Sequence, residues 1–227
     1  MLRRVLIANR GEVALRILRT CREMGIETVA VYSEADREAL HVQLAARSVC
    51  IGPARATESY LNQEALLTVA RAAGCDGIHP GYGFLSENAD FADACRRAGV
   101  AFIGPSGDAI RRAGSKSAAR EIMRAAGVPV TPGSDGPVSS AEEALLAAER
   151  VGYPVLLKAS AGGGGRGIRR CQGPEELPGA FQEARAEARA CFGSGEMFLE
   201  QLVLEPRHIE FQILADRQGN VIHLGER

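Results

Sequence analysis

The sequence predicts an α/β protein with a doubly wound parallel-sheet domain followed by a second, α+β domain. Apolar runs at 3–8 and 27–32 flank a segment whose apolar residues recur at helical spacing, the pattern of a βαβ unit with parallel strands. Strand and helix patterns then alternate over about the first 110 residues, as in a doubly wound sheet. Beyond them, a glycine-rich loop between two predicted strands indicates a different organisation.

The elements of the first domain follow from local patterns. Ala14, Ile17, Leu18 and Cys21 recur at helical spacing, and Gly25 is expected to end that helix as its C′ residue. Further strands are predicted at 48–51, 77–79 and 101–103. Helices are predicted between them at 60–73 and 87–97. Ser86 is expected to cap the helix at 87–97, with Glu87 in its first turn.

The second domain is expected to begin near residue 114, which gives domains of 1–113 and 114–227. A helix at 115–126 precedes a Pro-, Gly- and Ser-rich stretch at 130–139 that reads as a linker, and Ser140 to Glu143 form a capping box. The later elements are predicted, in order, as a strand ending at Lys158, the glycine loop, a strand at 168–171, a helix from Pro174 to about Ala190, strands at 197–203, 207–215 and 220–225, and a turn at 216–220.

The composition is that of an ordinary globular protein. Net charge is −1, which gives no reason to expect nucleic acid or an anionic membrane as a partner, and no apolar run is long enough to span a bilayer. The N-terminus leads directly into a strand without a cleavable signal. The six cysteines form no C-x-x-C pair and are interpreted as small buried hydrophobic residues in a reducing cytoplasm, in preference to a zinc site or disulfides.

The most informative segment is 154–168, where an apolar strand ends in Lys158 and opens into a loop containing Gly162, Gly163, Gly164, Gly165 and Gly167. Glycine has no Cβ, so successive N–H groups can approach an anion, and the lysine adds a point charge suited to phosphate oxygens. A nucleotide polyphosphate is the simplest ligand for both. The alternative is a flexible surface hairpin, for which five glycines would carry a large entropic cost.

The order of the elements distinguishes among phosphate-binding loops. The loop matches G-x-G-x-x-G, but the dinucleotide fingerprint must open a helix, whereas a short strand at 168–171 follows here. Neither this loop nor residues 114–117 match the P-loop pattern. A protein-kinase loop carries its lysine on the following strand, whereas Lys158 precedes the loop here. A strand ending in lysine, then a glycine loop, then a strand resembles the ATP-grasp superfamily.

Five blocks sharpen this resemblance. They are Val5–Ala14 (VLIANRGEVA), His79–Asn88 (HPGYGFLSEN), Gly114–Lys116, the glycine loop, and Phe198–Gln201 with Pro206–Gln212. In this order and spacing they are similar to the N-terminal half of biotin carboxylase, a subunit of acetyl-CoA carboxylase and the first domain of pyruvate, propionyl-CoA and related carboxylases. The resemblance implies a Rossmann-like biotin carboxylase N-terminal (pre-ATP-grasp) domain at 1–113. It implies an incomplete ATP-grasp domain at 114–227, with a glycine-rich lid at about 131–203.

The resemblance also assigns the nucleotide-binding residues. Lys116 opens a helix and taken alone reads as a solvated lysine, but the resemblance makes it a phosphate ligand, like Lys158 and the loop glycines. Glu200, Gln201 and Val203 correspond to the segment that receives adenine; the family more often has lysine and leucine at the last two positions, and backbone contacts tolerate the change. His208 is implied near the ribose. It alternates with Glu210 on a predicted strand, so the two should face the same side.

Other assignments concern biotin and the partner subunit. The resemblance places Tyr82 and Glu87 beside the carboxylation centre, facing biotin. Glu12, Arg16, Arg19 and Glu23 form a charged helical stripe that would ordinarily be a solvated face. The resemblance makes Arg19 and Glu23 candidate contacts in a homodimer of the full-length protein.

The implied function is that of a ligase. ATP phosphorylates bicarbonate to carboxyphosphate, and the CO2 that it releases is taken up by biotin on a biotin carboxyl carrier protein or domain. Magnesium or manganese acts as cofactor and a carboxyltransferase as partner, in a cytoplasmic pathway such as fatty acid biosynthesis. Two alternatives remain open: a non-catalytic nucleotide-binding module, and another ATP-grasp ligase such as a carbamoyl-phosphate synthetase or a purine-pathway carboxylase. The His79–Asn88 block argues against the second.

The resemblance also implies which parts of the chemistry the sequence lacks. We expect the glutamates that bind the metal, the bicarbonate arginine and the general base to lie outside these 227 residues. No residue of this chain is therefore assigned as a metal ligand. We expect the chain on its own not to catalyse biotin carboxylation.

Overall fold

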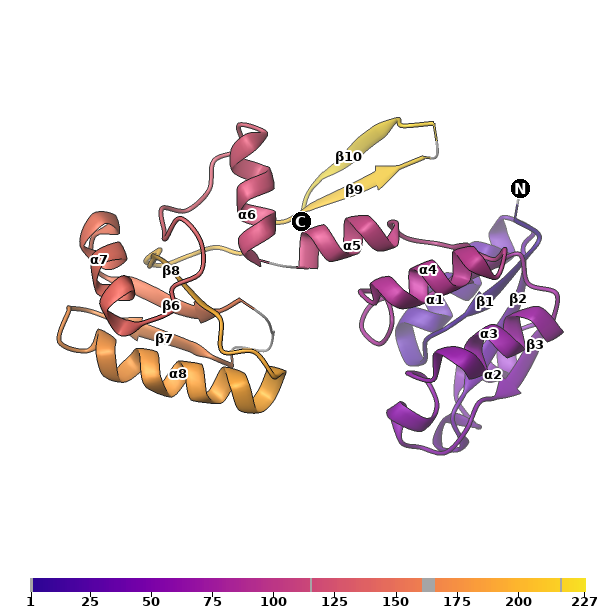
Figure 1. Cartoon of the computed structure of the whole chain (residues 1–227). Coiled ribbons are helices and arrows are strands. Elements are labelled where there is room, and N and C mark those ends of the chain that lie inside the picture. Colours follow the sequence, from indigo (N-terminus) through magenta and orange to yellow (C-terminus); the bar gives the residue numbers. More distant parts are fainter. Residues whose placement is uncertain (1, 115, 161–165, 217) are drawn as a thin grey trace. The chain divides into compact units, whose positions relative to one another are not determined.

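The structure is a computed structural model that describes residues 2–114, 116–160, 166–216 and 218–227 (Figure 1). It divides into two compact units, Met1–Ile122 and Met123–Arg227. The division falls inside helix α6 (Lys116–Ala125), whereas the boundary predicted from the sequence lies just before this helix.

The first unit is built on a five-stranded parallel sheet with strand order β3-β2-β1-β4-β5. Its strands are β1 (Arg4–Ile7), β2 (Glu27–Tyr32), β3 (Arg47–Cys50), β4 (Gly77–His79) and β5 (Ala101–Phe102). Its helices are α1 (Gly11–Glu23), α2 (Leu40–Leu44), α3 (Gln63–Ala72), α4 (Ala89–Arg97) and α5 (Gly107–Gly114), with 3-10 turns at Glu34–Asp36 and Ala56–Glu58. The strand order changes direction between β1 and β4, so the predicted doubly wound sheet is confirmed.

Both faces of this sheet are covered by helices. On one face, strand side chains such as Leu6 and Ile78 pack against Leu66 of α3 and Phe91 of α4. On the other face, Val5 and Ile7 pack against the buried stripe of α1, which comprises Ala14, Ile17, Leu18 and Cys21. The alternation along β1 and the helical spacing along α1 therefore place apolar groups where the sequence pattern predicts them.

The helix ends in this unit show one confirmed and one wrong prediction. Gly25 follows the C-cap of α1 with φ of 69°, a left-handed conformation that favours glycine, as expected for a C′ residue. The cap of α4, however, is Asn88 and not Ser86: the Asn88 side chain accepts a hydrogen bond from the Phe91 N–H at 2.8 Å. Ser86 lies in a turn, where its N–H donates to the Gly83 carbonyl. The helix therefore starts later than predicted.

The sequence patterns also missed helices α2 and α5. Helix α2 has five residues, too few for a periodic pattern to be visible. Helix α5 is held to α4 by Arg111, which lies 2.9 Å from Asp90 and 2.6 Å from Asp93. These contacts join segments that are distant in sequence, so local patterns do not report them.

The second unit contains a three-stranded antiparallel sheet, with order β7-β6-β8, and a β9–β10 hairpin. The strands are β6 (Val155–Ala159), β7 (Ile168–Cys171), β8 (Met197–Gln201), β9 (Phe211–Ala215) and β10 (Val221–Glu226). Helices α7 (Ala141–Val151) and α8 (Leu177–Phe192) pack on one face of the three-stranded sheet, and Figure 1 shows α8 running along it. The predicted α+β organisation is confirmed.

Several boundaries in this unit differ from the predictions. Helix α8 begins at Leu177, with Pro178 in its first turn, so the predicted start at Pro174 is wrong. Residues 172–176 form a turn instead, in which the Glu176 carboxylate accepts a hydrogen bond from the Gln172 N–H at 2.8 Å. The stretch 130–139 is more than a linker, since the Ser134 and Val138 N–H groups bond to carbonyls of β8. Strand β8 ends two residues earlier than predicted.

The capping box before α7 is confirmed in a modified form. The Ser140 hydroxyl accepts from the Glu143 N–H at 3.2 Å, while the Glu143 carboxylate accepts from the N–H of Ser139, one residue before the cap, at 2.8 Å. The turn between β9 and β10 is also confirmed: the Asp216 carboxylate accepts the N–H groups of Gln218 and Asn220 at 2.9 Å each.

The cysteines are free, and four of them are buried as predicted: Cys21, Cys75, Cys95 and Cys171. Cys50 ends the edge strand β3 and Cys191 lies in the last turn of α8; both are exposed, so for these two the prediction of burial is wrong. Burial raises the pKa of Cys75 and Cys95 to about 11, which keeps both as neutral thiols. Among the helices that the structure describes, none is long and apolar enough to cross a membrane.

Candidate functional site

The face of the three-stranded sheet opposite α7 and α8 carries an acidic and a basic side chain among apolar ones. Along β6, Val155, Leu157 and Ala159 point into the core beneath α7 and α8. Because side chains alternate along a strand, Leu156 and Lys158 point to the opposite face. The pairing of β6 with β8 puts Glu200 opposite Leu156 and Phe198 opposite Lys158, so both share that face.

Lys158 and Glu200 form an ion pair on this face. Their side chains are only 22% and 15% exposed, so their attraction is less screened than that of a surface pair. Phe198 and Leu156 supply apolar surface beside the pair. The arrangement offers an ammonium donor, a carboxylate acceptor and an apolar floor, which together suit a flat polar ring that carries an anionic tail.

The segment after Glu200 includes backbone donors of both kinds, bonded and unbonded. The Gln201 N–H bonds to the Pro132 carbonyl at 2.8 Å, and the Leu202 N–H bonds to the Pro154 carbonyl at 2.9 Å. The Val203 N–H has no acceptor within the described part of the chain. A ligand beside Glu200 could therefore accept a hydrogen bond from Val203, while the side chains of Gln201 and Val203 are exposed.

Gly162, Gly163, Gly164 and Gly165, predicted to contact phosphate, lie outside the described residues. The far stem of their loop is described. Gly167 has φ of 66°, and a Cβ there would lie 2.9 Å from the Ala159 Cβ, so only glycine fits. Its N–H and the Arg169 guanidinium bond to Glu187 of α8 at 3.1 and 3.0 Å, and these contacts lower the pKa of Glu187. Glu187 thus fixes the stem to α8, a role that no local pattern signalled.

The remaining predicted nucleotide ligands are placed less completely. Lys116 opens α6, and the structure describes its backbone only. His208 and Glu210 precede β9 instead of alternating on it, so that prediction is wrong, although their side chains do meet at 3.3 Å. The His208 hydrogen bond lowers the pKa of Glu210. No hydrogen bond or ion pair among the described residues joins His208 to Lys158 or Glu200.

In the first unit, the carboxyl ends of β1 and β4 meet where the strand order changes direction, the position at which open α/β sheets bind ligands. Asn9, directly after β1, donates to the carbonyls of Pro80 at 2.7 Å and Tyr82 at 2.9 Å. Gly81 has φ of 67°, and a Cβ there would lie 2.8 Å from the Asn9 amide nitrogen. These contacts fix the loop backbone and leave Tyr82 exposed, with its hydroxyl 3.2 Å from Glu12.

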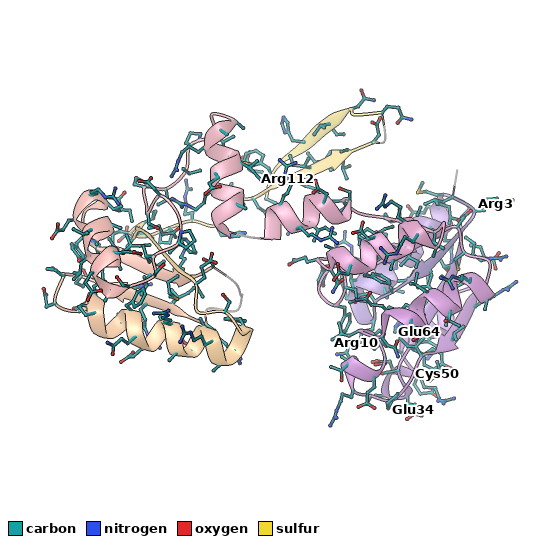
Figure 2. The ribbon with its side chains drawn as sticks, viewed as in Figure 1. Arg3, Arg10, Glu34, Cys50, Glu64 and Arg112 are labelled. Carbon is teal, nitrogen blue, oxygen red and sulfur yellow. The ribbon has the colours of Figure 1, made fainter. Side chains whose placement is uncertain are left out.

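A second set of contacts holds the same loop through Arg10, labelled in Figure 2. Its guanidinium lies 5.5 Å from the Tyr60 ring centroid and 5.6 Å from that of Phe84, and the two rings stack at 5.0 Å. Asp36 accepts hydrogen bonds from Tyr60 at 2.7 Å and Ser33 at 2.6 Å. Burial acts to raise the pKa of Asp36, but these bonds and Arg10 outweigh it and lower the pKa. Sequence reasoning missed Arg10, Asp36 and Asn9, because their roles depend on side chains from distant segments.

The other predicted residues lie at the surface of the first unit. Glu87 is exposed in the turn before α4. Arg19 and Glu23 are exposed on α1, and the charged stripe shows a contact of 3.8 Å between Glu12 and Arg16. Within the described residues, no group of three or more His, Cys, Asp or Glu side chains is arranged to hold a metal ion.

Comparison with known families and structures defines the class of protein. Residues 1–110 match the family described as "Biotin carboxylase, N-terminal domain", and residues 115–227 match "Carbamoyl-phosphate synthase L chain, ATP binding domain". The fold also superposes on the biotin carboxylase–ATP complex from Campylobacter jejuni with a TM-score of 0.95 and 51% identity, covering 100% of this chain and 51% of that one. The chain is therefore of the ATP-grasp class.

Individual relatives of known identity indicate the family. The chain is 54% identical to "Biotin carboxylase 1" of Bacillus subtilis and 55% identical to "Biotin carboxylase" of Pseudomonas aeruginosa, covering 100% of this chain in both cases and 50% and 51% of the relatives. It also resembles the biotin carboxylase domain dimer of the Hydrogenobacter thermophilus 2-oxoglutarate carboxylase in complex with MgADP, ADP and bicarbonate. The TM-score is 0.93 and the identity 50%, covering 100% of this chain and 50% of that one. The chain belongs to the biotin carboxylase family. It spans about half the length of the relatives that it matches.

Proposed function

We propose that the chain contributes the nucleotide-binding part of an enzyme that uses ATP and bicarbonate to carboxylate biotin on a carrier protein. The observation that carries this proposal is the Lys158–Glu200 pair on the sheet face opposite α7 and α8, in a unit that matches an ATP-binding domain. The Glu200 carboxylate accepts from the 6-amino group of adenine, and the Val203 N–H donates to a ring nitrogen. Lys158 then donates to the phosphate tail, with Lys116 and the loop glycines as further phosphate ligands and His208 near the ribose.

The choice of basic residue supports this assignment. The chain has 27 lysines and arginines, and only Lys116 and Lys158 are lysines. Arginine serves at every other basic position. An ammonium is a compact point charge that suits phosphate oxygens, whereas a guanidinium favours planar bidentate partners. The two positions proposed to contact phosphate are thus the two at which the sequence departs from arginine.

Magnesium is the metal that neutralises phosphate charge in such reactions. Within the described residues, no group of three or more His, Cys, Asp or Glu side chains is arranged to hold a metal ion, and we assign no magnesium ligand to this chain. The metal would reach the site bound to the nucleotide, as the MgADP of the Hydrogenobacter relative illustrates.

The remaining proposals concern the first unit and the partners. The loop fixed by Asn9 and Arg10 presents Tyr82 and Glu87 to the biotin of a carrier protein, and a carboxyltransferase then uses carboxybiotin. Arg19 and Glu23, exposed on α1, contribute to a homodimer. We further propose the domain boundary at 113/114, a lid at about 131–203 and a cytoplasmic location.

The activity of the full-length protein tests the proposal. We expect it to hydrolyse ATP in a manner that depends on bicarbonate and free biotin, and the 227-residue chain alone to show no such activity. Replacing biotin with ammonia or aminoimidazole ribonucleotide should abolish turnover by the full-length protein. Turnover with either substitute, or none with biotin, would contradict the proposal.

A further inference from the structure

Among the described residues, one buried serine has a hydroxyl without a hydrogen-bond partner. Of the serines whose burial the structure describes, four are buried: Ser33, Ser59, Ser134 and Ser160. The hydroxyls of the first three donate to Asp36, to the Arg55 carbonyl and to the Gly136 carbonyl, at 2.6, 2.9 and 2.7 Å. The Ser160 hydroxyl has no partner within the described part of the chain, although the residue is only 7% exposed.

The position of Ser160 explains why this hydroxyl matters. It follows β6 directly, and its N–H bonds to the Glu196 carbonyl at 2.9 Å, which extends the β6–β8 ladder to this residue. Lys158 and Ser160 are two residues apart, so their side chains share the face that carries Glu200. At about 3.3 Å per residue, the hydroxyl lies roughly 6–7 Å further along the strand than Lys158, away from Glu200.

A structural role alone does not account for the residue. A hydroxyl that is shielded from water and unpaired costs stability, and alanine would remove that cost. Ala159 and Ala161 flank the residue in sequence, so the chain uses alanine on both sides of it. A partner brought by a ligand resolves the conflict, since the cost is then recovered on binding.

We propose that Ser160 is a further nucleotide-binding residue, whose hydroxyl donates a hydrogen bond to a phosphate oxygen of ATP. The assignment rests on the proposed function, which puts adenine at Glu200 and the phosphate tail beyond Lys158. A nucleotide oriented in this way runs along β6 toward Ser160. The hydroxyl supplies a neutral donor next to the ammonium, which adds direction to a contact that the lysine makes as a point charge.

The test compares Ser160→Ala with Ser134→Ala in the full-length protein. Ser134 is the matched control, because its hydroxyl donates to Gly136 and also accepts from the Leu199 N–H at 3.2 Å. Ser160→Ala should weaken ATP binding by about tenfold or more, as expected for loss of a hydrogen bond to a charged group, without lowering the unfolding temperature of the nucleotide-free protein. Ser134→Ala should lower that temperature and leave the ATP dissociation constant unchanged.

A ligand series and a second variant locate the contact. Calorimetry with ATP, ADP and adenosine should show the Ser160→Ala loss for the two phosphorylated ligands and not for adenosine. Ser160→Cys, which keeps a weak donor of similar size, should fall between wild type and alanine. Unchanged ATP affinity in Ser160→Ala, or an equal loss with adenosine, would overturn the assignment.

The same measurements separate the failure of this inference from failure of the proposed function. If wild-type protein binds no ATP, the proposed function fails. If Lys158→Gln weakens ATP binding while Ser160→Ala does not, the nucleotide site stands and only the role of Ser160 is rejected. A lower unfolding temperature in Ser160→Ala with unchanged affinity would identify Ser160 as a structural residue.

Discussion

At the scale of single residues, the chain separates groups that stabilise the fold from groups available to a ligand. Asn9, Asp36 and Ser134 use their hydrogen-bonding capacity within the protein. The Ser160 hydroxyl and the Val203 N–H do not, among the described residues. Ser160 lies on the face that carries Lys158, and Val203 lies two residues beyond the end of β8. Unused polar groups next to a partly shielded ion pair are characteristic of a site that awaits its ligand.

The buried His41 and the half-buried His79 give the first unit a pH-dependent stability. Burial lowers the pKa of His41, partly offset by a backbone group of Val31 and by Asp36, and burial also lowers the pKa of His79. Each folded-state pKa lies below the unfolded value of about 6.5, so the unfolded chain binds more protons as the pH falls below that value. The free energy of unfolding should therefore decrease from pH 7 toward pH 5.

The variant His41→Leu tests this expectation. It removes one titrating group, so its free energy of unfolding should vary less steeply between pH 7 and pH 5, by up to about 1 kcal/mol per pH unit. Asp36 remains charged in this window because its own pKa is lowered, and His79 should leave a smaller slope of the same sign. Urea unfolding at several pH values measures the slope, and equal slopes for wild type and variant would contradict the account.

At the scale of secondary-structure elements, helix capping shows what local sequence does and does not determine. The βαβ unit, the turn at Asp216 and the cap at Ser140 were predicted because each depends on neighbours in sequence. The start of α4 was predicted wrongly, since Ser86 and Asn88 are both good caps and only the preceding turn decides between them. Helix α5 was missed because its contacts come from α4.

The start of α4 yields a paired prediction. Asn88→Ala removes the acceptor for the Phe91 N–H and should cost about 1 kcal/mol of stability. Ser86→Ala, two residues earlier, should change stability by no more than about 0.5 kcal/mol. Chemical denaturation of both variants measures the difference. An equal loss of stability in the two variants, or a larger loss for Ser86→Ala, would contradict the assignment of Asn88 as the cap.

Some residues of the candidate site could be proposed from the sequence, and others could not. Lys158 and the loop glycines could be proposed from sequence, because a lysine before a glycine loop is a local signal, whereas Glu200 was proposed from the resemblance to biotin carboxylase. Glu187, Arg10 and Asp36 could not, because each acts on a segment distant in sequence. Nothing in the sequence distinguishes Ser160 from an ordinary buried serine. Its unpaired hydroxyl is seen only in the hydrogen bonding of the described residues.

At the scale of the whole molecule, the chain carries two domains of a protein family whose members are about twice as long. The β9–β10 hairpin exposes apolar surface. Its apolar side chains are half or more exposed: Phe211, Ile213, Leu214, Val221, Ile222 and Leu224. An isolated two-stranded hairpin is marginally stable in water, so these strands need further structure or a partner to cover them. Experiments on function therefore belong with the full-length protein.

ATP binding by the full-length protein, measured by calorimetry for wild type, Lys158→Gln and the control Arg150→Gln, tests the central claim most directly. Arg150 is exposed and lies 3.5 Å from Asp135, so its loss removes one positive charge from the same unit at a residue of α7, outside the β6–β8 face. The account predicts that Lys158→Gln weakens ATP binding by about tenfold or more, while Arg150→Gln binds like wild type. Equal affinities for all three proteins would contradict it.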